Sequence, residues 1–133
     1  MPSIQQLKFL INLARIDQVI GDKERQFIIR IGQANHLLIA EILPLFSSEH
    51  ADVVPANLTN EEKFDYLLSL IQLMKIDEKI YYNEIKYCAD VASALGYRKE
   101  VLFELMLNVQ SANMESDEIE ALKKLTATYL LHS

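Results

Sequence analysis

The sequence predicts an all-α protein: a compact bundle of six or seven helices that forms a single domain over residues 1–133. Three observations lead to this prediction. The 133 residues include only three glycines and three prolines, so tight turns are few and the regular elements are long. Apolar residues make up half of the chain and recur at spacings of three and four, which is typical of amphipathic helices. No stretch alternates apolar and polar residues as a half-buried strand would.

The first half begins with a helix that we expect to start just after Ser3, whose hydroxyl can cap the first turn. Its apolar residues form two neighbouring stripes, so this helix should be buried on two sides and lie near the centre of the bundle. A second helix is predicted from about residue 22 to residue 35. A third apolar pattern covers residues 36–46. Pro44 should end or kink it, because proline lacks the amide proton that a helix interior needs.

The two halves are joined by the loosest stretch of the chain, residues 47–58, which is rich in turn formers. Thr59 and Glu62 then form a capping-box pattern, in which each side chain bonds the other residue's backbone amide, and open a long apolar helix. The helix after it should end at about residue 95, where Gly96 supplies a left-handed C-terminal residue.

The rest of the chain predicts two more helices. One covers about residues 98–109. The last covers about residues 116–131, with Ser116 as its cap. Acidic residues follow in its first turn, where the helix dipole favours negative charge.

A shift of 60 positions aligns two related halves, about residues 3–46 and 59–110. Six of eight matched positions are apolar and keep the helical phase, and the other two are an Asp and a Glu at fixed spacing. We infer two copies of a helix–corner–helix unit related by a pseudo-twofold axis. The matched pairs are Leu7 and Leu67, Leu10 and Leu70, Leu13 and Leu73, Ile16 and Ile76, Asp17 and Asp77, Ile20 and Ile80, Glu24 and Glu84, and Ala34 and Ala94.

We call residues 14–24 and 74–84 the first and second corner, and their acidic residues have two interpretations. The first is structural. If the second helix has its N-cap at Gly21, Glu24 is the third helical residue and its carboxylate can reach back to the N-cap amide. Asp17 can accept hydrogen bonds from the loop amides that follow it. Ile20 would then fix the corner by packing into the core.

The second interpretation is a divalent-cation site, because hard cations such as Ca²⁺, Mg²⁺ or Mn²⁺ prefer oxygen ligands. The spacing is not that of an EF-hand, since Ile28 stands where the bidentate Glu is needed. If the pseudo-twofold axis brings the two corners together, four carboxylates could share one ion. The candidate ligands are Asp17, Asp22 and Glu24 in the first corner and Asp77 and Glu84 in the second.

The corner sequence Ala-Arg-Ile-Asp-Gln-Val-Ile-Gly-Asp-Lys-Glu, which completes a Leu-x-x-Leu-Ala run, resembles the tellurite-resistance TerB-like family. The resemblance covers nearly the whole chain. It implies a compact all-α domain of two related halves and a role in tellurite-type stress response. It implies no reaction; distant members serve as accessory domains beside chaperone or membrane modules. The family's acidic positions fall on Asp17, Glu24, Asp77 and Glu84.

The charge pattern limits the choice of partner. The net charge is −6, and after residue 60 thirteen acidic residues face eight basic ones without a basic stripe, so we expect no nucleic-acid binding. No apolar run approaches the ~20 residues of a membrane helix, and the first residues show no signal-peptide pattern. We expect a soluble cytoplasmic protein without direct membrane insertion.

Catalytic groups are not indicated by the sequence, and we expect no enzyme activity. Cys88 lies within an apolar helical pattern, as a small core residue does, rather than at a nucleophile's site. His36, His50 and His132 show no metal-site or triad spacing, and there is no glycine-rich phosphate loop.

Two functional hypotheses follow. The first is a non-enzymatic, TerB-like stress-response domain that binds a divalent cation through its corners. The second is a protein-interaction or scaffold domain with structural corners, whose partner is another protein or a second copy of the chain. Tyr81 and Tyr82 in the second corner would suit a partner surface if they are exposed. The alternative is that they pack against the neighbouring half.

Overall fold

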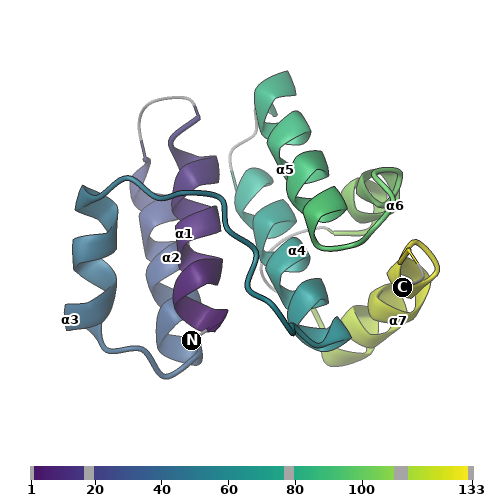
Figure 1. Ribbon diagram of the computed structural model, residues 1–133, viewed down its shortest axis with the longest axis horizontal. Coiled ribbons are helices and arrows are strands. Elements are labelled where there is room, and N and C mark those ends of the chain that lie inside the picture. Colours follow the sequence, from purple (N-terminus) through teal and green to yellow (C-terminus); the bar gives the residue numbers. More distant parts are fainter. Residues whose placement is uncertain (1, 17–19, 77–79, 110–113, 132–133) are drawn as a thin grey trace.

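The fold is known from a computed structural model that describes residues 2–16, 20–76, 80–109 and 114–131. These residues form seven α-helices and one 3₁₀ helix, and none of them belongs to a strand, which confirms the predicted all-α class (Figure 1). The helices are α1 (Pro2–Ala14), α2 (Asp22–Ala34), α3 (Ile39–Ile42), η1 (Leu43–Ser47), α4 (Asn60–Met74), α5 (Tyr82–Ala94), α6 (Val101–Asn108) and α7 (Ser116–Ala127).

The two halves repeat their secondary structure at the spacing found in the sequence. Helices α2 and α5 begin and end 60 residues apart, and so do the C-terminal ends of α1 and α4. Both α2 and α5 are followed by a left-handed residue, His36 with φ 68° and Gly96 with φ 99°. The helix–corner–helix unit therefore occurs twice, whereas the pseudo-twofold axis stays a prediction.

A basic residue at the end of each unit's first helix makes the same contact in both halves. Arg15 donates to the carbonyls of Phe46 and Ser48 at the end of η1. Lys75, 60 residues later, donates to the carbonyls of Met106 and Val109 at the end of α6. A cation is favoured there because the last carbonyls of a helix lack intrahelical partners and carry partial negative charge. The third segment of each half is held to the first in this way.

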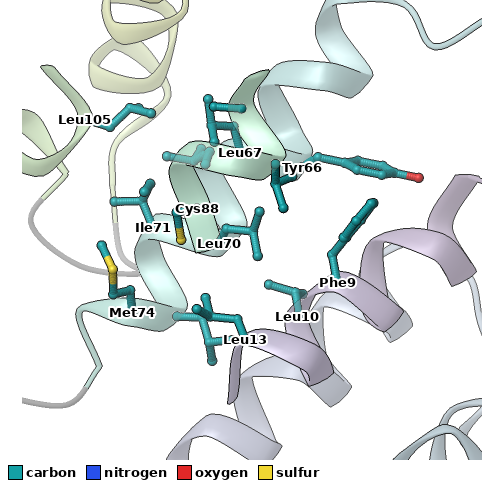
Figure 2. Packing of buried hydrophobic residues seen from close by; sticks show 14 of the residues in the cluster. Phe9, Leu10, Leu13, Tyr66, Leu67, Leu70, Ile71, Met74, Cys88 and Leu105 are labelled. Atoms are coloured by element: carbon teal, nitrogen blue, oxygen red, sulfur yellow. The ribbon is translucent and has the colours of Figure 1, made fainter. Parts of the chain in front are cut away.

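The core is centred on α4, in which ten of fifteen residues are buried. One side of α4 packs against α1, and the other packs against α5 and α6 (Figures 1 and 2). Phe9 of α1 meets Tyr66 of α4 edge to face, with ring centroids 5.9 Å apart. The leucines expected at the centre are all buried, which confirms their assignment: Leu10, Leu13, Leu70 and Leu73.

The third segment of the first half is shorter than the pattern over residues 36–46 suggested. It contains one α-helical turn, α3, and changes to the 3₁₀ helix η1 at Leu43, with Pro44 in its first turn. This position suits Pro44, because the first residues of a helix need no amide donor.

Two predicted caps are corrected. Helix α1 already includes Pro2, so Ser3 lies inside the helix rather than before it. The N-cap of α7 is Glu115, and Ser116 is the first helical residue. Helix α7 also ends at Ala127, and α6 begins at Val101 rather than near residue 98.

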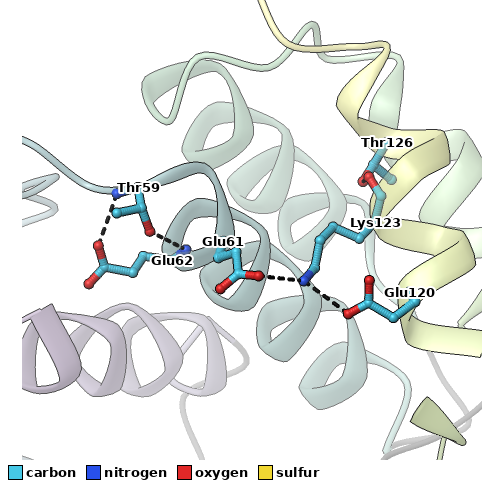
Figure 3. A network of polar contacts seen from close by, with 6 residues as sticks. All are labelled: Thr59, Glu61, Glu62, Glu120, Lys123 and Thr126. Atoms are coloured by element: carbon cyan, nitrogen blue, oxygen red, sulfur yellow. Dashed lines mark hydrogen bonds and ion pairs between the residues drawn. The ribbon is translucent and has the colours of Figure 1, made fainter. Parts of the chain in front are cut away.

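The start of α4 follows the sequence prediction. Thr59 N donates to Glu62 Oε1 at 2.9 Å, and Glu62 N donates to Thr59 Oγ1 at 3.1 Å, which completes the capping box (Figure 3). Helix α7 is tied to this end of α4 by Lys123, which reaches Glu61 at 3.0 Å and Glu120 at 3.2 Å. Both ion pairs involve exposed glutamates, and the pair with Glu120 lies within α7, so each contributes little to stability.

The connection between the halves is hydrogen-bonded to one helix of each half. Asp52 accepts hydrogen bonds from Asn12 of α1 at 2.8 Å and from the Tyr87 hydroxyl of α5 at 2.6 Å. His50 bonds the carbonyl of Leu45 at 2.8 Å. Within the described residues, every helix is too short or too polar to cross a membrane.

Candidate functional site

The glutamates of the two corners have the same role in the structure. Glu24 is the third residue of α2, and its Oε1 accepts a hydrogen bond from Gly21 N at 3.1 Å. Glu84 is the third residue of α5, and its Oε1 accepts one from Tyr81 N at 3.0 Å. Each carboxylate satisfies an N-cap amide and also complements the positive end of the helix dipole. The structural interpretation of Glu24, with its cap at Gly21, is confirmed.

This device is not confined to the corners. Three other helices begin with the same contact between the carboxylate of the third residue and the N-cap amide. The pairs are Glu41 with Leu38 at 2.9 Å, Glu62 with Thr59 at 2.9 Å, and Glu118 with Glu115 at 3.0 Å. A glutamate at this position is thus a common way for this chain to begin a helix, and it needs no ligand.

The remaining candidate cation ligands are less well defined. Asp17 and Asp77 lie outside the described residues. The predicted convergence of four carboxylates involves both of them. Asp22 is exposed in the first turn of α2, where its charge suits the helix dipole. Among the described residues, no three His, Cys, Asp or Glu side chains come close enough to hold a metal ion. A shared cation between the corners stays a prediction.

The two corners differ in burial. Glu84 is only 6% exposed, whereas Glu24 is partly open to solvent. Ile20 packs against the core as expected, but its counterpart Ile80 is exposed. The residues that follow it are exposed too: Tyr81 at the N-cap of α5, and Tyr82 with 75% of its surface free. The alternative in which both tyrosines pack against the neighbouring half is therefore wrong.

The third segment of each half also presents large apolar side chains to solvent. On α6, Phe103 and Leu107 are one turn apart, and 70% and 75% of their surfaces are exposed. They lie opposite the buried residues of this helix, so they point away from the core. We call this pair the α6 surface.

In the first half, the α3 surface consists of Leu38, which is 67% exposed, with Ile39 and Leu43. Leu43 and Phe103 are 60 residues apart and so occupy matching positions in the two halves. Figure 1 places α3 at one end of the long axis of the molecule and α6, beside α7, toward the other. The repeat therefore carries two apolar surfaces, on helices that lie far apart in the molecule.

The candidate nucleophile and bases are placed as structural residues. Cys88 is fully buried beside Leu70 and Ile71, and burial raises the pKa of its thiol, which keeps it unreactive (Figure 2). His36 occupies the left-handed position after α2, and His50 holds the connection between the halves. His132 lies outside the described residues.

A group of buried polar residues was not among the site residues predicted from the sequence. Gln6 of α1 and Ser69 and Gln72 of α4 are buried among apolar neighbours, and Gln6 Nε2 donates to Ser69 Oγ at 3.1 Å. With Asn35 and Asp65 they line a cavity of about 140 Å³ where α1, α2 and α4 meet. The available signal was the spacing of Asp65, Ser69 and Gln72, which places three polar residues on one stripe of an otherwise apolar helix.

Searches with family models, among curated proteins and among solved structures found no match to this chain. The resemblance to the TerB-like family therefore rests on the corner residues themselves and stays a prediction.

Proposed function

We propose that this protein is a scaffold domain that binds protein partners through the α3 and α6 surfaces, and that its acidic corners serve to build the fold. The observation that carries the proposal is the exposure of Phe103 and Leu107, which point straight out from the core. Large apolar side chains gathered on one exposed face mark protein contacts more often than chance exposure does.

The energetics of these surfaces support binding. Burial of a Phe or Leu side chain contributes about 1.5–3 kcal/mol, so a partner that covers the α6 surface gains several kcal/mol from two residues. Side chains of this kind on a helix face fit the apolar groove or helix of another protein. Because α3 and α6 lie far apart in the molecule, one copy of the domain can hold two partners, or can join copies of itself into a chain.

The corners enter this proposal as structural elements. Capping of α2 and α5 accounts for Glu24 and Glu84 without a ligand. The TerB-like resemblance implies the cellular role in this proposal. The protein would be an accessory domain in stress response that acts by contact rather than by catalysis. Cation binding at the corners is the second candidate, because Asp17 and Asp77 match each other across the repeat and carboxylates are the ligands that hard cations prefer.

The first test is self-association. Light scattering over a range of protein concentrations should show oligomers if the partner is a second copy, and a monomer if the partner is a different protein. The variant Phe103→Ser/Leu107→Ser should abolish any oligomer that uses the α6 surface. Val53→Ser is the matched control, because Val53 is an exposed apolar residue outside both surfaces.

The second test is capture of a partner by immobilised protein. A partner of the α6 surface should be lost with Phe103→Ser/Leu107→Ser, and one of the α3 surface with Leu38→Ser/Leu43→Ser. The same partner should be retained by Val53→Ser. If wild type remains monomeric and every captured protein binds all three variants equally, the proposed function is wrong. The variant Tyr81→Ala/Tyr82→Ala tests the second corner in the same way.

A further inference from the structure

The cavity between α1, α2 and α4 has an unusual balance of hydrogen-bonding groups. Five of its lining residues are polar: Gln6, Asn35, Asp65, Ser69 and Gln72. Two aliphatic side chains complete the walls. Its volume of about 140 Å³ leaves room for several water molecules. A small molecule or one long side chain would fill the same space.

The orientation of two amides is fixed by their partners. Gln6 Nε2 bonds the carbonyl of Asp65 at 3.3 Å, and Asn35 Nδ2 bonds the carbonyl of Ile31 at 2.8 Å. A carbonyl only accepts hydrogen bonds, so the nitrogen of each amide must face it. The oxygens of Gln6 and Asn35 are thereby left as acceptors.

The carboxylate of Asp65 adds a third acceptor to these two amide oxygens. Within the part of the chain that the structure describes, no hydrogen bond or ion pair ends on Gln6 Oε1, on Asn35 Oδ1 or on the Asp65 carboxylate. Asp65 remains exposed, yet the helices around it desolvate its carboxyl enough to raise its pKa. A hydrogen-bond donor with a positive charge would satisfy all three groups.

We propose that this cavity binds a small organic cation that carries N–H donors, a guanidinium or a primary ammonium group. The carboxylate of Asp65 supplies the charge, and the two amide oxygens accept from the remaining N–H groups. Ile31 and Leu68 line the aliphatic walls, against which the methylene stem of such a cation can pack. Lysine and arginine do not line the cavity, and around Asp65 the positive charge of Lys123 is offset by the negative charges of Glu61 and Glu62.

The cation can come from two sources, a free small molecule or the side chain of an Arg or Lys in a partner protein. The inference does not depend on the α3 and α6 surfaces, because the cavity lies on other helices. A free cation can bind whether or not the proposed scaffold function is correct.

The test is a titration of isotope-labelled protein followed by NMR. Methylguanidinium should cause saturable shifts in the side-chain amide signals of Gln6 and Asn35, with a dissociation constant on the order of 1 mM, as expected for so small a ligand. Tetramethylammonium at the same ionic strength is the control, because it has the charge but no N–H donor. Acetyl-arginine-amide binding more tightly than methylguanidinium would identify a protein side chain as the source; the reverse order would identify a free small molecule.

Variants link the shifts to the cavity. Asp65→Asn should weaken binding about tenfold, which corresponds to about 1.4 kcal/mol. Asp90→Asn, which removes an exposed carboxylate elsewhere on the molecule, should leave binding unchanged. Circular dichroism confirms that each variant is folded.

The inference is overturned by any of three results. The first is shifts that never saturate and spread over the acidic surface. The second is an equal response to tetramethylammonium, and the third is wild-type affinity in Asp65→Asn. A crystal soaked with methylguanidinium that shows only water in the cavity would also overturn it.

Discussion

The capping role of Glu84 can be separated from a role in cation binding by two substitutions. Glu84→Ala removes the acceptor of the Tyr81 amide and the negative charge at the start of α5. Glu84→Gln removes the charge but keeps an oxygen that can accept the same bond. A capping contact should tolerate Gln far better than Ala, whereas a cation ligand should tolerate neither.

The expected magnitudes follow from the geometry. The lost hydrogen bond costs about 1 kcal/mol, and the lost charge at the N-terminus of a helix costs about 0.3–1 kcal/mol. Because Glu84 is 6% exposed, water cannot easily replace it, so Glu84→Ala should lower the free energy of unfolding by about 2 kcal/mol. Glu84→Gln should cost less than ~1 kcal/mol. Glu41→Ala removes the same contact at the exposed start of α3 and should cost about 0.5 kcal/mol.

The assay is urea unfolding followed by far-UV circular dichroism, in buffer with EDTA and again with Ca²⁺, Mg²⁺ or Mn²⁺. The order of stability should be wild type, Glu84→Gln, Glu84→Ala, with the same differences in every buffer. Equal losses for Gln and Ala, or a loss that appears only with a cation present, would show that Glu84 acts as a ligand rather than as a cap.

Four further predictions can be checked with the same assay or by calorimetry. Leu70→Ala, at the centre of the core, should lower the free energy of unfolding by ~2–5 kcal/mol, and an unchanged urea midpoint would contradict the assignment of the bundle core. Lys75→Met should cost about 1.5–3 kcal/mol, because the carbonyls of Met106 and Val109 lose a charged donor, while Lys86→Met on the exposed face of α5 should be neutral. Desolvation raises the pKa of Asp65 in the folded state, so its ionised carboxylate disfavours folding at neutral pH, and this penalty is lost in acid where the carboxyl is protonated. Asp65→Asn should therefore stabilise the protein by less than about 1 kcal/mol at neutral pH and leave stability unchanged in acid, which stability measurements from neutral to acidic pH would reveal. Calorimetric titration with Ca²⁺, Mg²⁺, Mn²⁺ or Zn²⁺ should release no heat if the corners are structural, and a saturable signal lost in Asp17→Asn would instead establish the cation site.

Much of the fold could be predicted from residues that act locally. The capping box at Thr59, the left-handed Gly96 and the break at Pro44 depend on backbone chemistry within a few residues, so their outcomes follow from sequence alone. The repeat was readable for the same reason, because both halves use identical local signals at a spacing of 60. The errors at Ser3 and Ser116 occurred where several neighbouring residues could each begin a helix.

The candidate sites show the same difference between local contacts, which are predictable, and contacts between distant segments, which are not. The bond from Glu24 to the Gly21 amide spans three residues and was predictable. The exposure of Tyr82 was not predictable, because it depends on which neighbours cover the second corner. The cavity lined by Gln6 and Asp65 could not be predicted either, because these residues are 59 positions apart and meet only when α1 packs on α4.

The sequence by itself determined an all-α chain, its two related halves and the glutamates that begin their second helices, because helix period and capping are local properties. Only the tertiary structure decided that the third segment of each half leaves large apolar side chains exposed to solvent. It also decided that polar residues of α1 and α4, with Asn35 at the end of α2, line an open cavity rich in acceptors. Both features arise from packing between distant segments, and no local pattern in the chain encodes which face of a helix remains uncovered.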